Sequence, residues 1–159
     1  MAFIDSGIVL GMTILAATAS AAMSGALVIS SYVSKAIQCK PSESVEKLGE
    51  DLSAAVESRM NVDDTFKAVL STYAQGVLRI YSIDPDIRYV ILEDPAVSIF
   101  TGNYGYFVHI TVVGESGRSN IRIVLEPKLG RRSVRDLNFL SSIVATAEAG
   151  LVINNNIEH

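Results

Sequence analysis

The hydrophobic and polar positions divide this chain into a long uncharged stretch and a patterned remainder. No charged residue occurs between Asp5 and Lys35, a run of 29 positions. As a helix this run would be roughly 43 Å long, which exceeds the roughly 30 Å hydrocarbon core of a bilayer. Only 12 of its residues are large and apolar, and the other 17 are Gly, Ala, Ser or Thr. The pattern predicts a hydrophobic helix within residues 1–40, followed by a domain over residues 41–159.

Small side chains recur every four residues along the hydrophobic stretch. Such rows let helix backbones approach closely where no water drives them together. The uncharged stretch is therefore expected to touch other helices, and copies of the same chain are the expected partners. The candidate interface comprises Asp5, Gly7, Gly11, Ala17, Ser20, Ala21, Ser24 and Gly25.

Two other interpretations of this stretch compete with an assembly helix. A cleaved signal peptide would use Ile8 to Leu15 as its apolar core, but no Lys or Arg precedes that core. A single-pass anchor is the second alternative. Lys35 and Lys40 follow the stretch and nothing basic precedes it, so the positive-inside rule would place the domain in the cytoplasm.

The remainder begins with two predicted helices. Val45, Leu48, Leu52, Val56 and Met60 recur at helical spacing after Ser42, which would cap the first helix. A second helix begins at 61–64 and buries Phe66, Val69, Leu70 and Tyr73.

From residue 76 the period changes from near four to two, which indicates strands. Five strands are expected, over 77–83, 87–92, 97–101, 106–113 and 120–125, with turns between them. They form an antiparallel meander with one face on a core and the other partly wet. A last amphipathic helix starts at Ser133 with Asp136 in a capping role, and Gly150 would end it. The predicted class is α+β: a long hydrophobic N-terminal helix, then helices packed on an antiparallel sheet.

Candidate chemistry is sparse in this sequence. The net charge of −4 gives no electrostatic footprint for nucleic acid. Cys39 is the single cysteine, and His109 is expected to be a partly exposed sheet residue without a catalytic partner. We expect no catalytic site, metal site or cofactor. The one basic cluster, a solvated loop or a contact for anionic lipid or an acidic neighbour, comprises Lys128, Arg131, Arg132 and Arg135.

The first nine residues, MAFIDSGIV, resemble the mature N-terminus of type IV pilin-like proteins. The run from Ile4 to Val9 is also similar to the I-E-Y-G-L-I run of the small Flp-type pilins. The resemblance covers about the first 35 residues, and Asp5 stands where that family has Glu. It implies that the helices bundle in a filament core, where the acid pairs with the N-terminal amine of a neighbouring subunit.

These features together predict a structural subunit in a membrane or cell-surface filament. Its partners would be copies of itself and, before assembly, membrane lipid. The alternative is a single-pass tethered domain that acts as a scaffold or sensor in a membrane complex. The sequence leaves open on which side of the membrane the domain lies.

Overall fold

The structure is a computed structural model that describes residues 31, 33–43, 48, 52–74, 76–97, 104–115, 117–129 and 134–155. The chain divides into two compact units, Met1–Gln38 and Cys39–His159. In the first unit, residue 31 and residues 33–38 are helical. The rest of the hydrophobic helix predicted within residues 1–40 lies outside the described residues.

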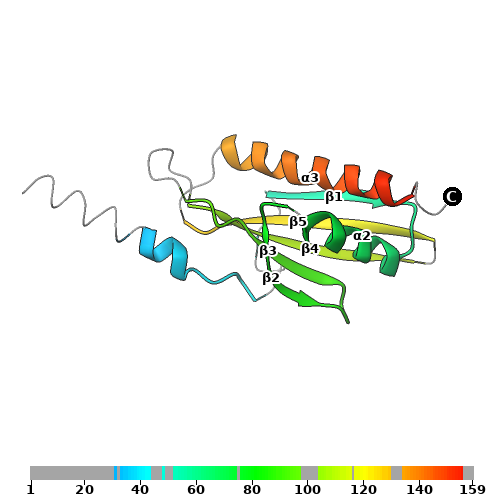
Figure 1. The fold of residues 1–159 in the computed structure, drawn as a ribbon, viewed down its shortest axis with the longest axis horizontal. Helices are drawn as coiled ribbons and strands as arrows, with labels where there is room; N and C mark the ends of the chain where they lie inside the picture. Colours follow the sequence, from blue (N-terminus) through cyan, green and yellow to red (C-terminus); the bar gives the residue numbers. More distant parts are fainter. Residues whose placement is uncertain are drawn as a thin grey trace, which may run out of the picture. The chain divides into compact units, whose positions relative to one another are not determined.

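The second unit is an α+β domain, as predicted, and its helices pack on an antiparallel sheet of five strands (Figure 1). Along the chain its elements are β1 (Ser53–Ser58), α2 (Val62–Ala74), β2 (Arg79–Asp84), β3 (Tyr89–Glu93), β4 (Tyr106–Glu115), β5 (Arg118–Pro127) and α3 (Val134–Asn155). The sheet order is β1-β5-β4-β3-β2. Strands β2 to β5 therefore form an antiparallel meander, in which β3 pairs directly with β4, and β1 joins it beside β5.

The β4–β5 hairpin is the longest pairing in the sheet. Its register runs from Tyr106 opposite Pro127 to Glu115 opposite Arg118. Gly117 in the connecting turn has a φ of +89°, a backbone region that glycine enters without steric cost. A turn between the last two strands was expected, and β4 continues to Glu115 before it.

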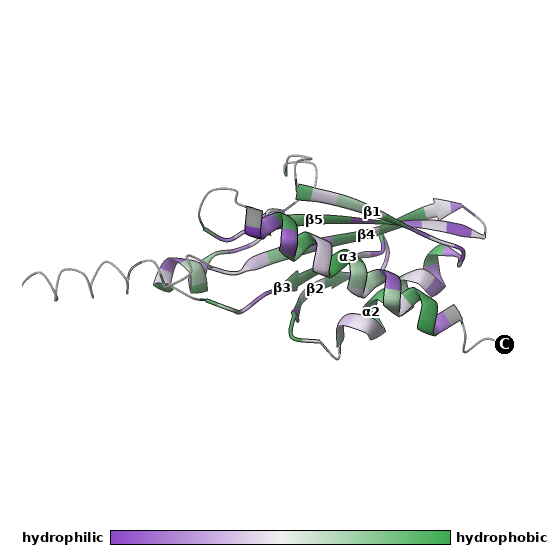
Figure 2. Ribbon diagram, turned by 90° about the horizontal axis from the view of Figure 1, so that it is seen from above, coloured by the Kyte–Doolittle hydropathy of each residue, from purple (hydrophilic) through white to green (hydrophobic). Residues whose placement is uncertain are grey.

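Both helices pack on one face of the sheet, which we call the inner face. In Figure 2, hydrophobic colour runs along the central strands, and α3 shows both hydrophobic and hydrophilic bands. Phe66, Val69 and Tyr73 of α2 are buried, as predicted. The inner face itself is lined by Val90, Leu92, Val108, Ile110, Ile121, Ile123 and Leu125.

The helix predicted through Leu52, Val56 and Met60 is wrong, because residues 53–58 form strand β1. β1 pairs with β5, with Val56 opposite Ile121. All three apolar residues are nevertheless buried in the core. A spacing of four fits one face of a helix and also one face of a strand, since four is a multiple of the strand period of two. The residue pattern alone could not separate the two elements.

Of the short strand expected over 97–101, only residue 97 is described, and it has no regular structure; residues 98–101 lie outside the described part. One further prediction about local structure is wrong. Gly150 does not end the last helix, which continues to Asn155. A Cβ at Gly150 would lie 2.1 Å from Thr72 Oγ1, so the missing side chain lets α3 approach α2 closely.

Helix α3 also has a property that bears on membrane interaction. Among the described residues, Arg135–Asn154 is long and apolar enough to cross a membrane by length and composition alone. Its buried residues, however, belong to the same core as the sheet: Leu140, Ile143, Ala147 and Leu151. Asp136 in its first turn accepts a hydrogen bond from Tyr106 at 2.7 Å. These contacts assign α3 to the domain, and Asp136 to a tertiary contact beyond the predicted capping role.

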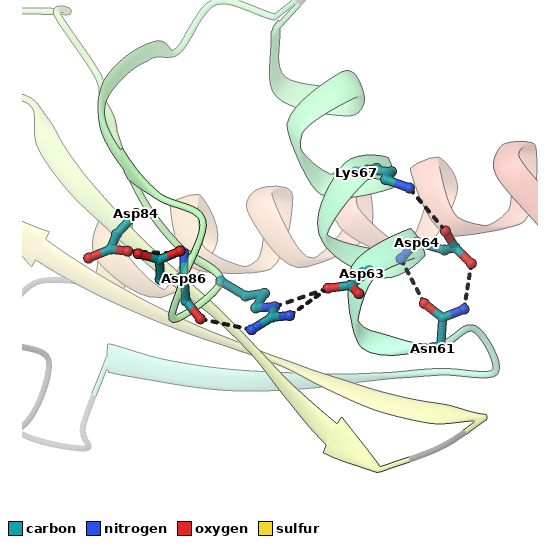
Figure 3. A network of polar contacts seen from close by, with 7 residues as sticks. Asn61, Asp63, Asp64, Lys67, Asp84 and Asp86 are labelled. Atoms are coloured by element: carbon teal, nitrogen blue, oxygen red, sulfur yellow. Dashed lines mark hydrogen bonds and ion pairs between the residues drawn. The ribbon is translucent and has the colours of Figure 1, made fainter.

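A polar network ties the start of α2 to the β2–β3 turn (Figure 3). Asn61 caps the helix by accepting a hydrogen bond from the Asp64 backbone N–H at 2.9 Å. Arg88 follows β2 in the turn and donates to Asp63 through Nε and Nη2 at 3.0 and 2.9 Å. Arg88 also donates to the carbonyl of Asp86 at 2.8 Å. The turn is therefore held against α2 by a two-donor contact to one carboxylate oxygen.

Candidate functional site

The most unusual polar residue of the sheet is His109, in the middle of β4. It lies between Ile91 of β3 and Val124 of β5, on the outer face, opposite to the helices. Its side chain is 0% exposed, so the prediction of a partly exposed histidine is wrong. Phe107, Val108 and Ile110 around it are fully buried as well. The run from 106 to 113 is largely apolar on both faces, which is typical of a strand covered on two sides.

His109 is the centre of a hydrogen-bonded chain that crosses the outer face. Tyr89 Oη lies 2.5 Å from His109 Nδ1, and His109 Nε2 lies 2.8 Å from Glu126 Oε2. An ionised carboxylate only accepts hydrogen bonds, so Nε2 carries a proton and donates to Glu126. In the neutral ring Nδ1 then accepts from the Tyr89 hydroxyl. Both ring nitrogens of the buried histidine therefore have a hydrogen-bond partner.

Glu126 extends this row of hydrogen bonds to residues 39–42, which follow the first unit. The backbone N–H of Ser42 donates to Glu126 Oε2 at 3.0 Å, and the Ser42 hydroxyl donates to Oε1 at 2.7 Å. Ser42 was predicted to cap a helix, and residues 44–47, which would form the first turn of that helix, lie outside the described residues. Cys39 lies on the same side of the domain, where its thiol contacts the carbonyl of Lys128 at 3.4 Å. Residues 39–42 are thus bonded to the end of β5.

The environment shifts the pKa values of Glu126 and Tyr89 in opposite directions. Burial acts to raise the pKa of the Glu126 carboxyl, but hydrogen bonds from His109 and Ser42 outweigh it, and the pKa lies below 4.5. Burial and the nearby Glu126 charge raise the pKa of Tyr89 to about 12. Burial also raises the pKa of the Cys39 thiol, which keeps it protonated at neutral pH. At neutral pH Glu126 is therefore ionised and Tyr89 keeps its proton.

A second buried polar contact lies beside the first. Lys128 Nζ is 2.5 Å from Glu93 Oε1 and 5.0 Å from the centre of the Phe107 ring. Lys128 was expected in a solvated basic loop, but its side chain is only 2% exposed. Its place in the sequence beside Arg131 and Arg132 suggested a single basic cluster. The ion pair with Glu93 on β3 instead fixes the position of the Lys128 side chain. The side chains at the centre of the outer face, Phe107 and His109, are therefore buried, although this face was expected to be partly exposed to water.

The geometry favours a structural role for this network. The Glu126 carboxylate accepts hydrogen bonds from both Ser42 and His109. His109 is fully buried. What the network can do is hold residues 39–42 on β5 through directional bonds to a buried charge. We call these contacts the junction network: Ser42, Tyr89, His109 and Glu126.

The structure places few of the interface residues predicted from sequence. Asp5, Gly7, Gly11, Ala17, Ser20, Ala21, Ser24 and Gly25 lie outside the described residues, as do Arg131 and Arg132. Arg135 is exposed in the first turn of α3. Sequence reasoning missed Glu126 and Tyr89 as site residues. Their only signal was a charged and an aromatic residue on strands next to the one that carries His109.

The chain was compared with known proteins. A scan against models of protein families finds no match, and a search of the curated proteins finds no relative. The function must therefore be argued from the chain itself.

The junction network makes the stability of the domain depend on pH. Because Glu126 has a lowered pKa when folded, its contribution to the free energy of unfolding is present above pH 4.5 and is lost as the pH falls through the folded pKa. Glu126→Gln should therefore destabilise the protein most near neutral pH. The difference from wild type should shrink as the pH falls below about 4.5 and through the lower pKa of the folded state. Urea unfolding at a series of pH values measures this.

Glu57→Gln is the matched control, since Glu57 is exposed on β1 and its loss should give no such trend. An equal effect of Glu126→Gln at all pH values would contradict the ionised carboxylate in the junction network.

Proposed function

We propose that this protein is a structural subunit whose N-terminal hydrophobic segments pack together in a pilus-like filament or membrane oligomer. The observation that carries the proposal is the uncharged run of residues 6–34, in which 17 of 29 side chains are small. A helix that faces only lipid gains little from such a composition, whereas a helix that packs against other helices gains close backbone contact. The α+β domain would lie outside the helical core of the assembly.

The junction network supports a subunit of this kind. The chain leaves its first unit at Gln38, and Ser42 is bonded to Glu126 four residues later. Glu126 is in turn bonded to His109 in the middle of the sheet. A domain that is carried by an assembled segment requires such an attachment, because the intervening residues would otherwise move freely. The resemblance of residues 1–9 to pilin N-termini is a second, independent support.

A tethered scaffold or sensor domain is the second candidate. It is favoured by the flanking charges, because Lys35 and Lys40 follow the hydrophobic run as they do in single-pass anchors. This candidate needs no contact between copies of the segment. The two candidates therefore differ in what a bulky residue in the small-residue rows would do.

Ala21→Leu in the full chain tests the proposal. It adds volume where two helices are nearly in contact, and overpacking of this kind typically costs about 1–3 kcal/mol per site. We expect assembly to be lost because the cost recurs in every subunit. Size-exclusion chromatography in detergent and negative-stain imaging would measure the assembled fraction.

Ala19→Leu is the matched control for this substitution. Ala19 lies on the helix line that Met23 and Leu27 continue, and large side chains are already present there. Unchanged assembly of Ala21→Leu, Ser24→Leu and Gly25→Leu alike would contradict packing through the small-residue rows and favour the tethered domain.

A further inference from the structure

Strand β2 is an edge of the sheet and exposes apolar side chains. It pairs with β3 on one side, and among the described residues it is the last strand of the sheet order on the other. All six of its residues are exposed, including Ile80, Tyr81 and Ile83. Val77 and Ile87, just beyond its two ends, are 85% and 61% exposed. An edge with unpaired backbone groups and apolar side chains is a template for another strand.

A bulge decides which face each β2 side chain occupies. Ile80 is opposite Leu92, but Ser82 is opposite Ile91, so Tyr81 is an extra residue in the pairing. Directly paired residues point to the same face of a sheet. Ile80 and Ile83 therefore share the inner face with Leu92 and Val90. Arg79, Ser82 and Asp84 share the outer face with Glu93, Ile91 and Tyr89. Tyr81 also points outward, since its ring packs edge-on against Phe107 at 5.6 Å.

This arrangement makes β2 complementary to itself. Consider a second copy of β2 placed antiparallel beside the first, related by a two-fold axis normal to the sheet between Tyr81 and Ser82. Arg79 then lies opposite Asp84 of the other copy, and both are on the outer face. Ile80 lies opposite Ile83 of the other copy, and both are on the inner face. Without the bulge these pairs would point to opposite faces, so the match depends on it.

We propose that β2 is a homodimer interface, in which the edges of two copies pair antiparallel to form one continuous ten-stranded sheet. The two-fold axis repeats each contact, giving two Arg79–Asp84 ion pairs on one face and two Ile80–Ile83 contacts on the other. The interface lies within the Cys39–His159 unit and does not depend on the function proposed for the N-terminal segment.

The edge is held in place for such pairing. Arg88 binds Asp63 at the start of α2 and so fixes the turn that follows β2 (Figure 3). Asp84 accepts a hydrogen bond from the backbone N–H of Asp86 at 3.1 Å, which orients its carboxylate at the end of the strand. Tyr81 anchors the middle of the strand on Phe107. A preorganised edge loses less conformational entropy when it binds.

Disulfide trapping in the full chain tests the register. Ile80→Cys with Ile83→Cys, in a Cys39→Ser background, places the two thiols opposite each other across the proposed axis. Within one chain they are three residues apart, roughly 10 Å, which is too far for a disulfide. We expect more than about half of the chains to form covalent dimers on mild oxidation. Denaturing gels score only covalent links, so non-covalent assembly through the N-terminal segment does not contribute.

The single variants Ile80→Cys and Ile83→Cys are the matched controls and should give little dimer. A double variant that stays monomeric, or single variants that cross-link equally well, would overturn the proposed pairing. Covalent ladders beyond the dimer would overturn the two-fold geometry, because a closed two-fold contact links only two copies.

Charge reversal tests the complementarity by a separate measurement. Arg79→Asp or Asp84→Arg alone turns both ion pairs into like-charge pairs, and we expect the dimer dissociation constant to rise about tenfold. The chain that carries both reversals restores opposite charges across the axis and should return to within about threefold of wild type. Sedimentation of the full chain in detergent, with the Ala21→Leu substitution present throughout, isolates this contact. Failure of the double reversal to recover binding would contradict the proposal.

Discussion

Replacing Asp5 with Ala should abolish assembly of the full chain, whereas Asp5→Glu should leave it nearly intact. In a pilin-like filament this carboxylate lies among apolar helices and pairs with the N-terminal amine of a neighbouring subunit. Removal of one partner leaves an uncompensated charge in an apolar environment, which costs about 3–5 kcal/mol. Glu keeps the charge and adds one methylene, so the pair can still form.

Filament or oligomer yield at equal expression measures this prediction for wild type and both variants. A tethered domain makes the opposite prediction. Asp5 would then lie in the hydrated interface, and its replacement would change stability by less than about 1 kcal/mol, as for other exposed sites. Equal yields for the three proteins would exclude the pairing role and make the tethered domain the better account.

The second large effect is expected at the buried ion pair of the outer face. Glu93→Ala should lower the free energy of unfolding by about 3 kcal/mol, near the lower end for a broken buried pair because Glu93 is partly exposed. The cost arises because Lys128 is only 2% exposed and would keep its charge without a counterion, while Glu93 is 24% exposed. Urea unfolding can be followed by tyrosine fluorescence, since the chain has six tyrosines and no tryptophan.

Lys128→Met supplies the matched comparison. It should cost less than Glu93→Ala, because water can reach the carboxylate that remains. Combined with Glu93→Leu it should bring stability to within about 1 kcal/mol of wild type, since an apolar pair of similar volume replaces the ions. Equal losses for the two single variants, with no recovery in the double, would show that the pair is not buried as described.

The predictions that came from strong periodicity are confirmed, and those that depended on an ambiguous spacing are wrong. The helix through Phe66, Val69 and Tyr73 is present because its three-and-four spacing fits no strand. The stripe through Leu52, Val56 and Met60 became strand β1 because a spacing of four fits both elements. Residues 53–58 form a strand because they pair with β5, which lies more than sixty residues further along the chain. Local sequence carries no information about such a partner.

The sequence by itself determined the α+β class, the buried face of helix α2 and the uncharged N-terminal stretch. Each depends on residue period or on backbone preferences that act over a few residues. Only the tertiary structure decided that His109 is buried, that Lys128 pairs with Glu93, and that Glu126 holds Ser42. These positions depend on which strands become neighbours, because burial and pairing of a polar side chain are properties of the whole sheet. The same holds for β2, whose self-complementary edge exists only because pairing with β3 creates a bulge at Tyr81.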